Sequence, residues 1–334
     1  MNVYDNFQDA YLDTLDDILK KDSYQVSPRG FRSLELLGAG FRIDNPLDRL
    51  ITHPSRRSNL VFNFAEALWY LTGRDDLAYL SYYAPSVRRY SSDGVRLTGT
   101  AYGPRISRYG AAGIDQWDAV LMQLRNDPDS KRAVIQIYQA EELQIPDNID
   151  VACTLALQFL LREGRLHAVG YMRANDAYRG MVSDVFSFTF LQEVLARQLG
   201  VSVGTYTHMV GSIHVYDPDL PAASDLLATE NTEGSSPMPS IPEGDVPGDI
   251  MRLMALEHQL RTNARRLAPG DIDSLELPHY WCEVAVLLEL HRRVKYSETA
   301  DAETISELLD WINPRYRQLM TRRFPVLDRE ASHA

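Results

Sequence analysis

The stretch from Asp150 to Tyr216 constrains the fold most, because almost all of it is assigned to regular elements joined by short turns. The predicted elements are, in order, a strand over 151–161, a turn at 162–165, a strand through Tyr171 and Arg173, a helix over 183–199 closed by Gly200, and a strand ending in His214 and Tyr216. Reactive and charged residues lie at the ends of these elements, so they could converge on one pocket.

Seven short segments in this order form a recognisable pattern. They are AEALWYLTG (65–73), TAYG (100–103), DPDSKR (127–132), Cys153, MRAND (172–176), Gly180 to Asp184 and GSIHVY (211–216). Over roughly residues 30 to 220 the pattern resembles the folate-dependent thymidylate synthase family, in particular its cytidylate hydroxymethylase branch. The resemblance implies an α+β fold, with a large mixed β-sheet flanked by helices, and a homodimer formed through the sheet face.

The sequence predicts a single domain over 1–334 with three regions. A catalytic core spans about 25–220, a Pro- and Gly-rich flexible loop spans 228–248, and a helical C-terminal region spans 250–325. Helices are expected over 250–268, 277–296 and 304–320, and an amphipathic helix over 5–21.

Composition limits the partners and the compartment. A net charge of −12 argues against nucleic acid and anionic membranes, although a local arginine cluster can still bind a mononucleotide. The two cysteines, Cys153 and Cys282, are too few for a disulfide framework or a cysteine zinc site, and no metal is expected. Cys282 and His291 are interpreted as packing or surface residues. No apolar run reaches membrane-spanning length and no signal peptide is evident, so we expect a cytoplasmic protein.

Cys153 is the candidate nucleophile, with an inert packed cysteine as the alternative. Addition of a thiolate to pyrimidine carbon 6 makes carbon 5 nucleophilic, and a nearby cation is needed to stabilise the thiolate. Arg173 is the candidate cation. The resemblance implies that carbon 5 then attacks the one-carbon unit of 5,10-methylenetetrahydrofolate, the co-substrate.

Glu66 and Tyr102 are the candidate proton-handling residues. Glu66 lies among apolar neighbours, where a desolvated carboxyl has a raised proton affinity. The resemblance makes it the proton-relay glutamate and makes Tyr102 the tyrosine that assists proton removal from the ring. The alternatives are an exposed helix position for Glu66 and a core tyrosine for Tyr102.

Asp184 is the candidate base-reading residue, and it replaces the asparagine of the synthases. An ionised carboxylate only accepts hydrogen bonds, so it matches the amino group of cytosine and opposes the carbonyl oxygen 4 of uracil. The alternative is a charge that interacts with the helix dipole.

The resemblance also assigns the phosphate and sugar contacts. Arg173 binds the phosphate together with Arg29 or Arg32, while Lys131 and Arg132 reach the phosphate site of the partner subunit. His214 and Tyr216 bind the ribose 3′-hydroxyl. Ala174 replaces a serine and leaves room for a 2′-hydroxyl, which favours CMP over dCMP. This combination resembles the cytidylate hydroxymethylases of mildiomycin-type nucleoside antibiotic pathways.

On the folate side the resemblance implies roles for Arg56, Arg57, Arg88, Asp176 and Gly180. Arg88 and Ser91 stand where the synthases have tryptophans that cover the reacting carbon. Without these rings water has access, so we predict hydroxymethylation of CMP and not reductive methylation. The alternatives are dCMP hydroxymethylation, dUMP methylation, and a catalytically silent nucleotide-binding homologue.

Overall fold

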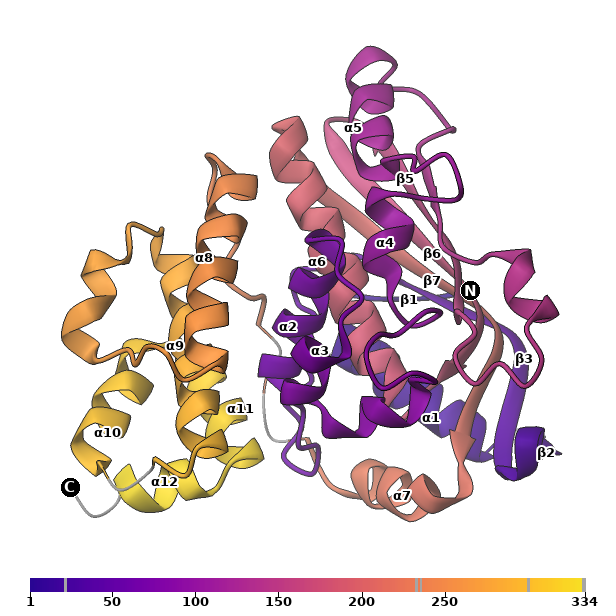
Figure 1. Ribbon diagram of the computed structural model, residues 1–334. Helices are drawn as coiled ribbons and strands as arrows, with labels where there is room; N and C mark the ends of the chain where they lie inside the picture. Colours follow the sequence, from indigo (N-terminus) through magenta and orange to yellow (C-terminus); the bar gives the residue numbers. More distant parts are fainter. Residues whose placement is uncertain (21–22, 232–233, 235, 299–300, 332–334) are drawn as a thin grey trace. The chain divides into compact units, whose positions relative to one another are not determined.

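Within the described residues (1–20, 23–231, 234, 236–298 and 301–331), the computed structural model contains a seven-stranded β-sheet (Figure 1). Its strands are β1 (Asn2–Tyr4), β2 (Tyr24–Val26), β3 (Ser33–Ile43), β4 (Val134–Gln136), β5 (Thr154–Arg162), β6 (Arg165–Asp176) and β7 (Ser202–Tyr216). The order is β1-β3-β7-β6-β5-β4, with β2 on β3. The β1–β3 and β6–β7 pairs are parallel and the others antiparallel. The predicted mixed sheet is confirmed.

The chain divides into two compact units, Met1–Arg56 with Trp69–Met238, and Arg57–Leu68 with Pro239–Ala334. The first contains the sheet and the helices α1 (Phe7–Lys20), α3 (Leu77–Tyr83), α4 (Tyr102–Ser107), α5 (Gln116–Asn126), α6 (Gly180–Leu199) and α7 (Leu220–Ala228). The second contains α8 (Val246–Arg261), α9 (His279–Lys295), α10 (Ala302–Trp311), α11 (Pro314–Arg323) and α12 (Val326–Ala331). Helix α2 (Leu60–Leu71) has residues in both units. The C-terminal helices are therefore confirmed.

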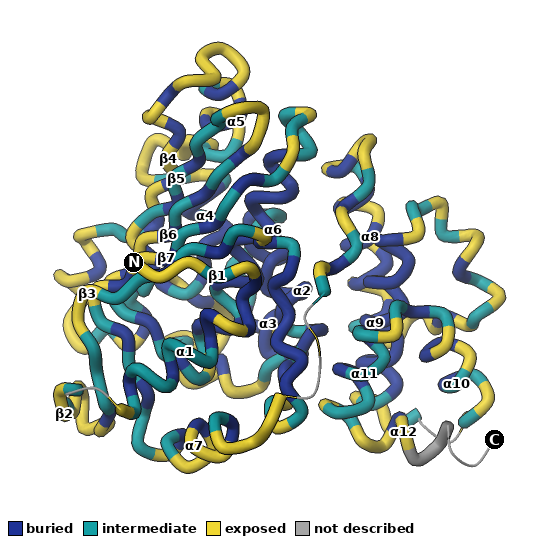
Figure 2. The backbone as a smooth tube through the Cα atoms, turned by 180° about the vertical axis from the view of Figure 1, so that it is seen from behind, coloured by how far each residue is buried: buried dark blue, intermediate teal, exposed yellow. Residues whose placement is uncertain are grey.

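The β5–β6 hairpin and α6 build the frame of the site. Glu163 and Gly164 have φ angles of 52° and 70°, the combination of a type I′ turn that suits a two-residue hairpin. Helix α6 packs on β6 and β7 and is buried along most of its length (Figure 2). It ends at Gly200, whose φ of 70° gives a left-handed cap, as predicted.

Several predicted boundaries were wrong. Strand β5 begins at Thr154 and not at 151, so Cys153 lies just before the strand. The predicted helix 304–320 is two helices, because Pro314 cannot donate to a preceding turn and starts α11 instead. Asn313 caps that start by accepting the amide hydrogen of Arg315 at 2.9 Å.

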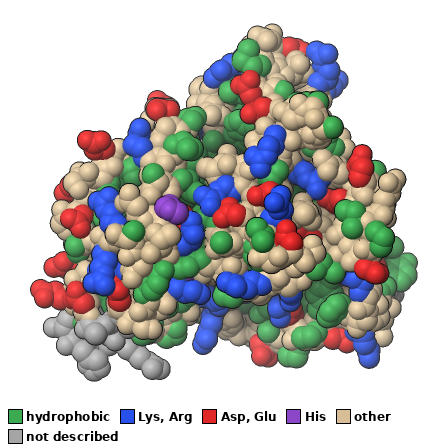
Figure 3. Space-filling model, viewed as in Figure 1, with side chains coloured by type: hydrophobic (Ala, Val, Ile, Leu, Met, Phe, Trp, Pro, Cys, Tyr) green, Lys and Arg blue, Asp and Glu red, His purple; other side chains and the backbone are tan. Residues whose placement is uncertain are grey.

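Helix α8 starts at Val246, inside the predicted loop 228–248, because the Asp245 side chain caps it by accepting the amide hydrogen of Gly248 at 3.0 Å. Residues 232, 233 and 235 of that loop, and the predicted helix end at Lys21, lie outside the described residues. Cys282 and His291 are buried on α9, in agreement with a packing role. On the face in Figure 3, basic and acidic side chains are intermingled.

A buried ion pair ties the segment after β3 to α6. Arg49 and Glu193 have fully buried side chains and form a hydrogen-bonded pair. The Arg49 guanidinium also lies 5.7 Å from the ring centroids of Phe186 and Phe190. A buried charge is strongly destabilising once its partner is removed.

We predict that Glu193→Ala lowers the free energy of unfolding by about 3–5 kcal/mol, because Arg49 keeps a buried, uncompensated charge. The control is Asp16→Ala, which removes the surface pair with Lys20 and should cost less than about 1 kcal/mol. Urea unfolding measures both. Equal losses in the two variants would contradict the prediction.

Candidate active site

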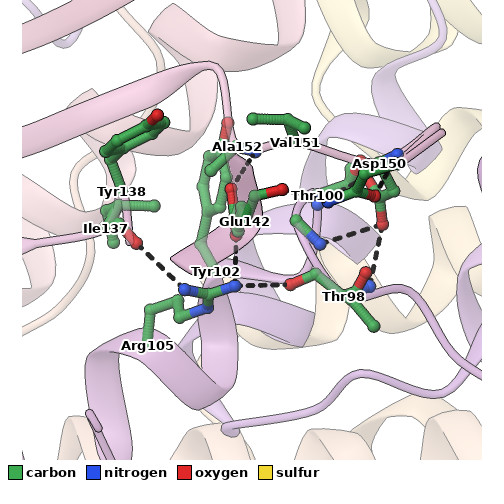
Figure 4. A network of polar contacts seen from close by, with 12 residues as sticks. Thr98, Thr100, Tyr102, Arg105, Ile137, Tyr138, Glu142, Asp150, Val151 and Ala152 are labelled. Carbon is green, nitrogen blue, oxygen red and sulfur yellow. Dashed lines mark hydrogen bonds and ion pairs between the residues drawn. The ribbon is translucent and has the colours of Figure 1, made fainter. Parts of the chain in front are cut away.

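The backbone before Cys153 is held by a buried carboxylate. Asp150 accepts hydrogen bonds from the backbone N–H groups of Thr98 at 2.8 Å, Gly99 at 3.0 Å and Thr100 at 2.8 Å, and from the Thr100 hydroxyl (Figure 4). A side chain at position 99 would collide with the Asp150 backbone, so this close approach requires glycine. Segment 98–100 thus anchors the turn that precedes the cysteine.

A second buried carboxylate supports the same turn from another side. Glu142 accepts the amide hydrogen of Ala152 at 2.9 Å and pairs with the Arg105 guanidinium (Figure 4). Arg105 also donates to the Thr98 carbonyl at 3.0 Å. Sequence reasoning missed Asp150, Glu142 and Arg105, because they lie in or beside irregular segments whose pairing no local pattern shows.

Arg173 on β6 bonds to the backbone that precedes Cys153 and lies beside its thiol. Its Nε donates to the Ala152 carbonyl at 2.8 Å and its Nη2 to the Val151 carbonyl at 2.9 Å, while Nη2 lies 3.6 Å from Cys153 Sγ. Burial raises the pKa of the Cys153 thiol, and the Arg173 charge lowers it. The predicted cation is therefore adjacent to the predicted nucleophile.

Asp184 lies in the second turn of α6 and faces β6. Its Oδ2 accepts a hydrogen bond from the Asn175 side-chain amide at 2.7 Å. Burial raises the pKa of Asp184 to about 7, and the hydrogen bond from Asn175 opposes this shift. A Cβ at Gly180 would lie 3.3 Å from Asn175 Nδ2 and 3.4 Å from Asp184 Oδ2, so glycine keeps this bond uncrowded.

Tyr102, at the start of α4, lies close enough to Asp184 and Cys153 to interact with their charges. Its hydroxyl oxygen accepts hydrogen bonds from the Thr154 backbone N–H at 3.3 Å and the Thr154 hydroxyl at 3.0 Å. Burial raises the pKa of Tyr102 well above its usual value, and the charges of Asp184 and Cys153 raise it further. Tyr102 thus stays neutral and keeps a proton to donate.

The ends of β6 and β7 bring the sugar and folate candidates together. Asp176 pairs in register with His214, and the rings of His214 and Tyr216 meet edge to face at 4.9 Å. Asp176 Oδ1 accepts the amide hydrogens of Tyr178 and Arg179, each at 3.0 Å. Burial raises the pKa of Asp176 and lowers that of His214.

The sequence of this chain matches one protein family over most of its length. The sequence profile described as "Thymidylate synthase" matches residues 9–245, which is more than two thirds of the chain. The chain belongs to the thymidylate synthase family. The predicted fold is thereby confirmed.

Two relatives carry a more specific name. The chain is 33% identical over 223 residues to "Deoxyuridylate hydroxymethyltransferase" of Bacillus phage SP01, covering 63% of this chain and 57% of the relative. It is 29% identical over 229 residues to the protein of the same name from Pseudomonas phage M6, covering 65% and 64%. The chain thus spans less than two thirds of these relatives.

The two phosphate candidates, Arg29 and Arg32, differ in their surroundings. Arg29 lies in the short 3₁₀ segment Pro28–Gly30 with a φ of 53°, and its charge lowers the pKa of both Cys153 and Tyr216. Arg32 instead pairs with Asp217 at 3.3 Å. These surroundings favour Arg29, and its phosphate role stays a prediction.

Ala174 on β6 pairs in register with Ser212 on β7, whose hydroxyl donates to Glu35 on β3. Lys131 and Arg132 are exposed beside β4, and in the described ranges no carboxylate pairs with either side chain. The roles assigned to these residues stay predictions.

The folate candidates Arg56 and Arg88 differ in their surroundings. Arg56 lies 4.7 Å from the Tyr178 ring centroid and donates to the Tyr178 carbonyl at 3.0 Å, so it supports the turn after Asp176. Arg88 is exposed on the 3₁₀ segment Pro85–Tyr90. Ser91 donates to the Arg96 carbonyl at 2.7 Å. Neither position carries an aromatic side chain.

Glu66 and Arg57 belong to the second unit. Glu66 is buried on α2, as a proton-relay carboxyl requires, and this role stays a prediction. In the part of the chain that the structure describes, no cluster of metal-ligand side chains is found, and no helix is long and apolar enough to span a membrane.

We predict that Arg173→Ala slows alkylation of Cys153 by iodoacetamide at pH 7 by about tenfold or more, because the thiolate loses its adjacent cation. The rate is measured by mass spectrometry in a Cys282→Ser background. The control, Arg162→Ala, removes an arginine of the same hairpin that bonds only backbone carbonyls. An unchanged rate in Arg173→Ala would show that Arg173 does not stabilise the thiolate.

Proposed function

We propose that this thymidylate synthase family member hydroxymethylates cytidine 5′-monophosphate at carbon 5, with 5,10-methylenetetrahydrofolate as co-substrate. The observation that carries the proposal is the contact of 3.6 Å between Cys153 Sγ and the Arg173 guanidinium, with the Asp184 carboxyl in the same electrostatic environment. This proximity supports a site that combines a nucleophile, a cation and a base-reading group.

Cys153 and Arg173 support the first chemical step. Arg173 stabilises the thiolate, which adds to carbon 6 and makes carbon 5 nucleophilic. In the described residues only two of the Arg173 nitrogens have acceptors, so Nη1 is left to bind a phosphate. Tyr102 keeps its hydroxyl proton and can exchange it with the ring during the removal of the carbon 5 proton.

Asp176 is suited to a pterin ring, because its side chain is half-buried and the backbone of the following turn uses only Oδ1. The folate supplies the one-carbon unit and leaves as tetrahydrofolate. Gly180, at the start of α6, keeps the neighbouring surface open. Arg56 shapes this region through Tyr178, and Arg88 is a solvent-exposed candidate for the folate side.

The proposal of water addition rests on Arg88 and Ser91. The family resemblance places shielding tryptophans at these positions, and here one side chain is exposed and the other bonds its own loop. Neither residue can supply an indole ring over the exocyclic methylene that remains on carbon 5. Water therefore has access to it, and a hydroxymethyl product follows.

Asp184 supports cytosine as the base. Its Oδ2 already accepts from Asn175, which favours the ionised carboxylate, and its Oδ1 remains for a ligand. Oδ1 accepts from the amino group of cytosine, and a pKa of about 7 suits a proton shared with ring nitrogen 3. The oxygen at position 4 of uracil would instead face a second acceptor.

Ala174 supports the ribonucleotide. Its methyl group is smaller than the serine side chain implied by the family resemblance, and it lies opposite Ser212, whose hydroxyl donates to Glu35. His214 lies opposite Glu35 and next to Tyr216, where the ribose hydroxyls are expected. The alternative substrate is dCMP, which requires that the same sugar site also binds deoxyribose.

The second candidate is hydroxymethylation of deoxyuridylate, because two relatives carry that name. It requires a protonated Asp184, which can donate to oxygen 4 of uracil. Burial raises the pKa of Asp184 to about 7, so the protonated form is populated at neutral pH. The product with each base therefore decides between the two candidates.

A homodimer through the sheet face is part of the proposal. Tyr171 on β6 and Met209 on β7 are register partners, and both are 37% exposed although they lie in the middle of the sheet. Leu155, the second residue of β5, is 38% exposed. A second copy would cover this apolar surface and bring its own Lys131 and Arg132 to the phosphate.

The proposed function predicts the product mass formed from an equimolar mixture of CMP, dCMP, UMP and dUMP with methylenetetrahydrofolate. We expect a hydroxymethyl adduct on CMP and none with Cys153→Ser. An adduct on dCMP alone would overturn the ribose assignment. A hydroxymethyl adduct on dUMP would support the second candidate, and a methyl group on dUMP would overturn the water path.

The dimer predicts that Met209→Arg shifts the protein to a monomer in analytical ultracentrifugation, because a buried, unpaired charge opposes association. The control is Met251→Arg, since Met251 is 63% exposed and lies in the second unit. A wild-type monomer, or a dimer that persists in Met209→Arg, would rule out this interface.

A further inference from the structure

Behind Asp184, a series of hydrogen bonds continues into the protein core. Asn175 donates to Asp184 at 2.7 Å, and its Oδ1 lies 3.0 Å from His208 Nε2. His208 Nδ1 lies 2.8 Å from the Tyr206 hydroxyl. Asn175 is 2% exposed, and His208 and Tyr206 are fully buried. The family comparison assigns no role to these three residues.

The Tyr206 hydroxyl sets the direction of this series. His208 is neutral, because burial lowers its pKa to about 3, so its ring has one N–H. Within the described residues His208 Nδ1 is the only acceptor for the Tyr206 hydroxyl proton. The N–H therefore lies on Nε2 and donates to Asn175, whose amide N–H₂ then points at Asp184.

This direction fixes what Asp184 offers to a ligand. Oδ2 accepts from Asn175, so a proton on the carboxyl is favoured on Oδ1, the oxygen left for the base, because the unprotonated oxygen is the stronger acceptor. The reversed series, with Oδ2 protonated, would leave the buried Tyr206 hydroxyl without an acceptor, which is unfavourable. The other titratable groups that act electrostatically with Asp184 are Asp176, Cys153, Tyr102 and Tyr206.

Gly170 on β6 provides the space for the hydroxyl that starts the series. It lies opposite His208 in the β6–β7 register. A Cβ at this position would be 2.6 Å from the Tyr206 Oη and 3.4 Å from the Phe188 ring. Any larger residue at 170 would displace the Tyr206 hydroxyl or the strand.

We propose that Tyr206, His208 and Asn175 are positioning residues that fix the hydrogen-bond direction at Asp184 and thereby set the preference between an amino-bearing and a carbonyl-bearing pyrimidine. The inference rests on the proposed function, since it assumes that Asp184 meets the base. It goes beyond that function by placing the control of base choice in the core behind the pocket.

The first test needs no activity. In ¹⁵N NMR of the wild-type protein we expect His208 as the Nε2–H tautomer. In Tyr206→Phe the reversed series is no longer unfavourable, so the Nδ1–H tautomer should appear, and the ¹³C titration midpoint of the Asp184 carboxyl should rise. An Nδ1–H tautomer in the wild type, or identical spectra in both proteins, would overturn the proposal.

The second test is the ratio of kcat/KM for CMP to that for UMP. We expect this ratio to fall by about tenfold or more in Tyr206→Phe and in Asn175→Leu. The matched control is Thr189→Val, which removes a buried hydroxyl of α6 that bonds the helix backbone at 2.7 Å and 3.1 Å. A merely structural role would lower both kcat/KM values together and leave the ratio unchanged.

The two tests separate the possible failures. If the wild type hydroxymethylates no nucleotide, the proposed function is wrong, while the tautomer measurement still decides the direction of the series. If the wild type is active and Tyr206→Phe has the same ratio as Thr189→Val, the proposed function stands and the positioning role is wrong.

Discussion

The two hydrogen bonds from Arg173 to the carbonyls of Val151 and Ala152 are the contacts on which the rest of the site depends. Just before β5 the Cys153 carbonyl accepts the backbone N–H of Arg173 at 2.8 Å, and β6 itself packs against α6 and is joined to β5 by the hairpin turn. The guanidinium holds Cys153 in a fixed position relative to β6, and it also places a positive charge beside the thiol. Asp150 and Glu142 hold the same turn through further hydrogen bonds.

Much of the fold could be predicted because local signals agreed with one another. Gly164 allowed the tight hairpin, Gly200 ended α6, and the apolar run between them marked a buried helix. Motif resemblance then selected Cys153 and Asp184, which the fold brings within electrostatic range of each other. The boundary at Pro314 was also visible in the sequence, since proline cannot continue a helix.

The rest of the site could not be predicted from local patterns. Glu142 and Arg105 meet across 37 positions of sequence, and no periodicity connects them. Asn175 lies between Ala174 and Asp176 on β6, and both Asn175 and His208 are buried. In a sequence, a polar residue at such a position is indistinguishable from any other buried polar group that has found a partner.

Gly170 has a consequence for the divergence of such proteins. It is not one of the residues assigned to the proposed pocket, yet it leaves the space in which the Tyr206 hydroxyl lies. An exchange at position 170 would alter base choice while every residue that contacts a nucleotide stays the same. Two descendants of one ancestor could then have identical pocket linings and act on different nucleotides. The residue that causes the difference in substrate would lie only in the buried interior.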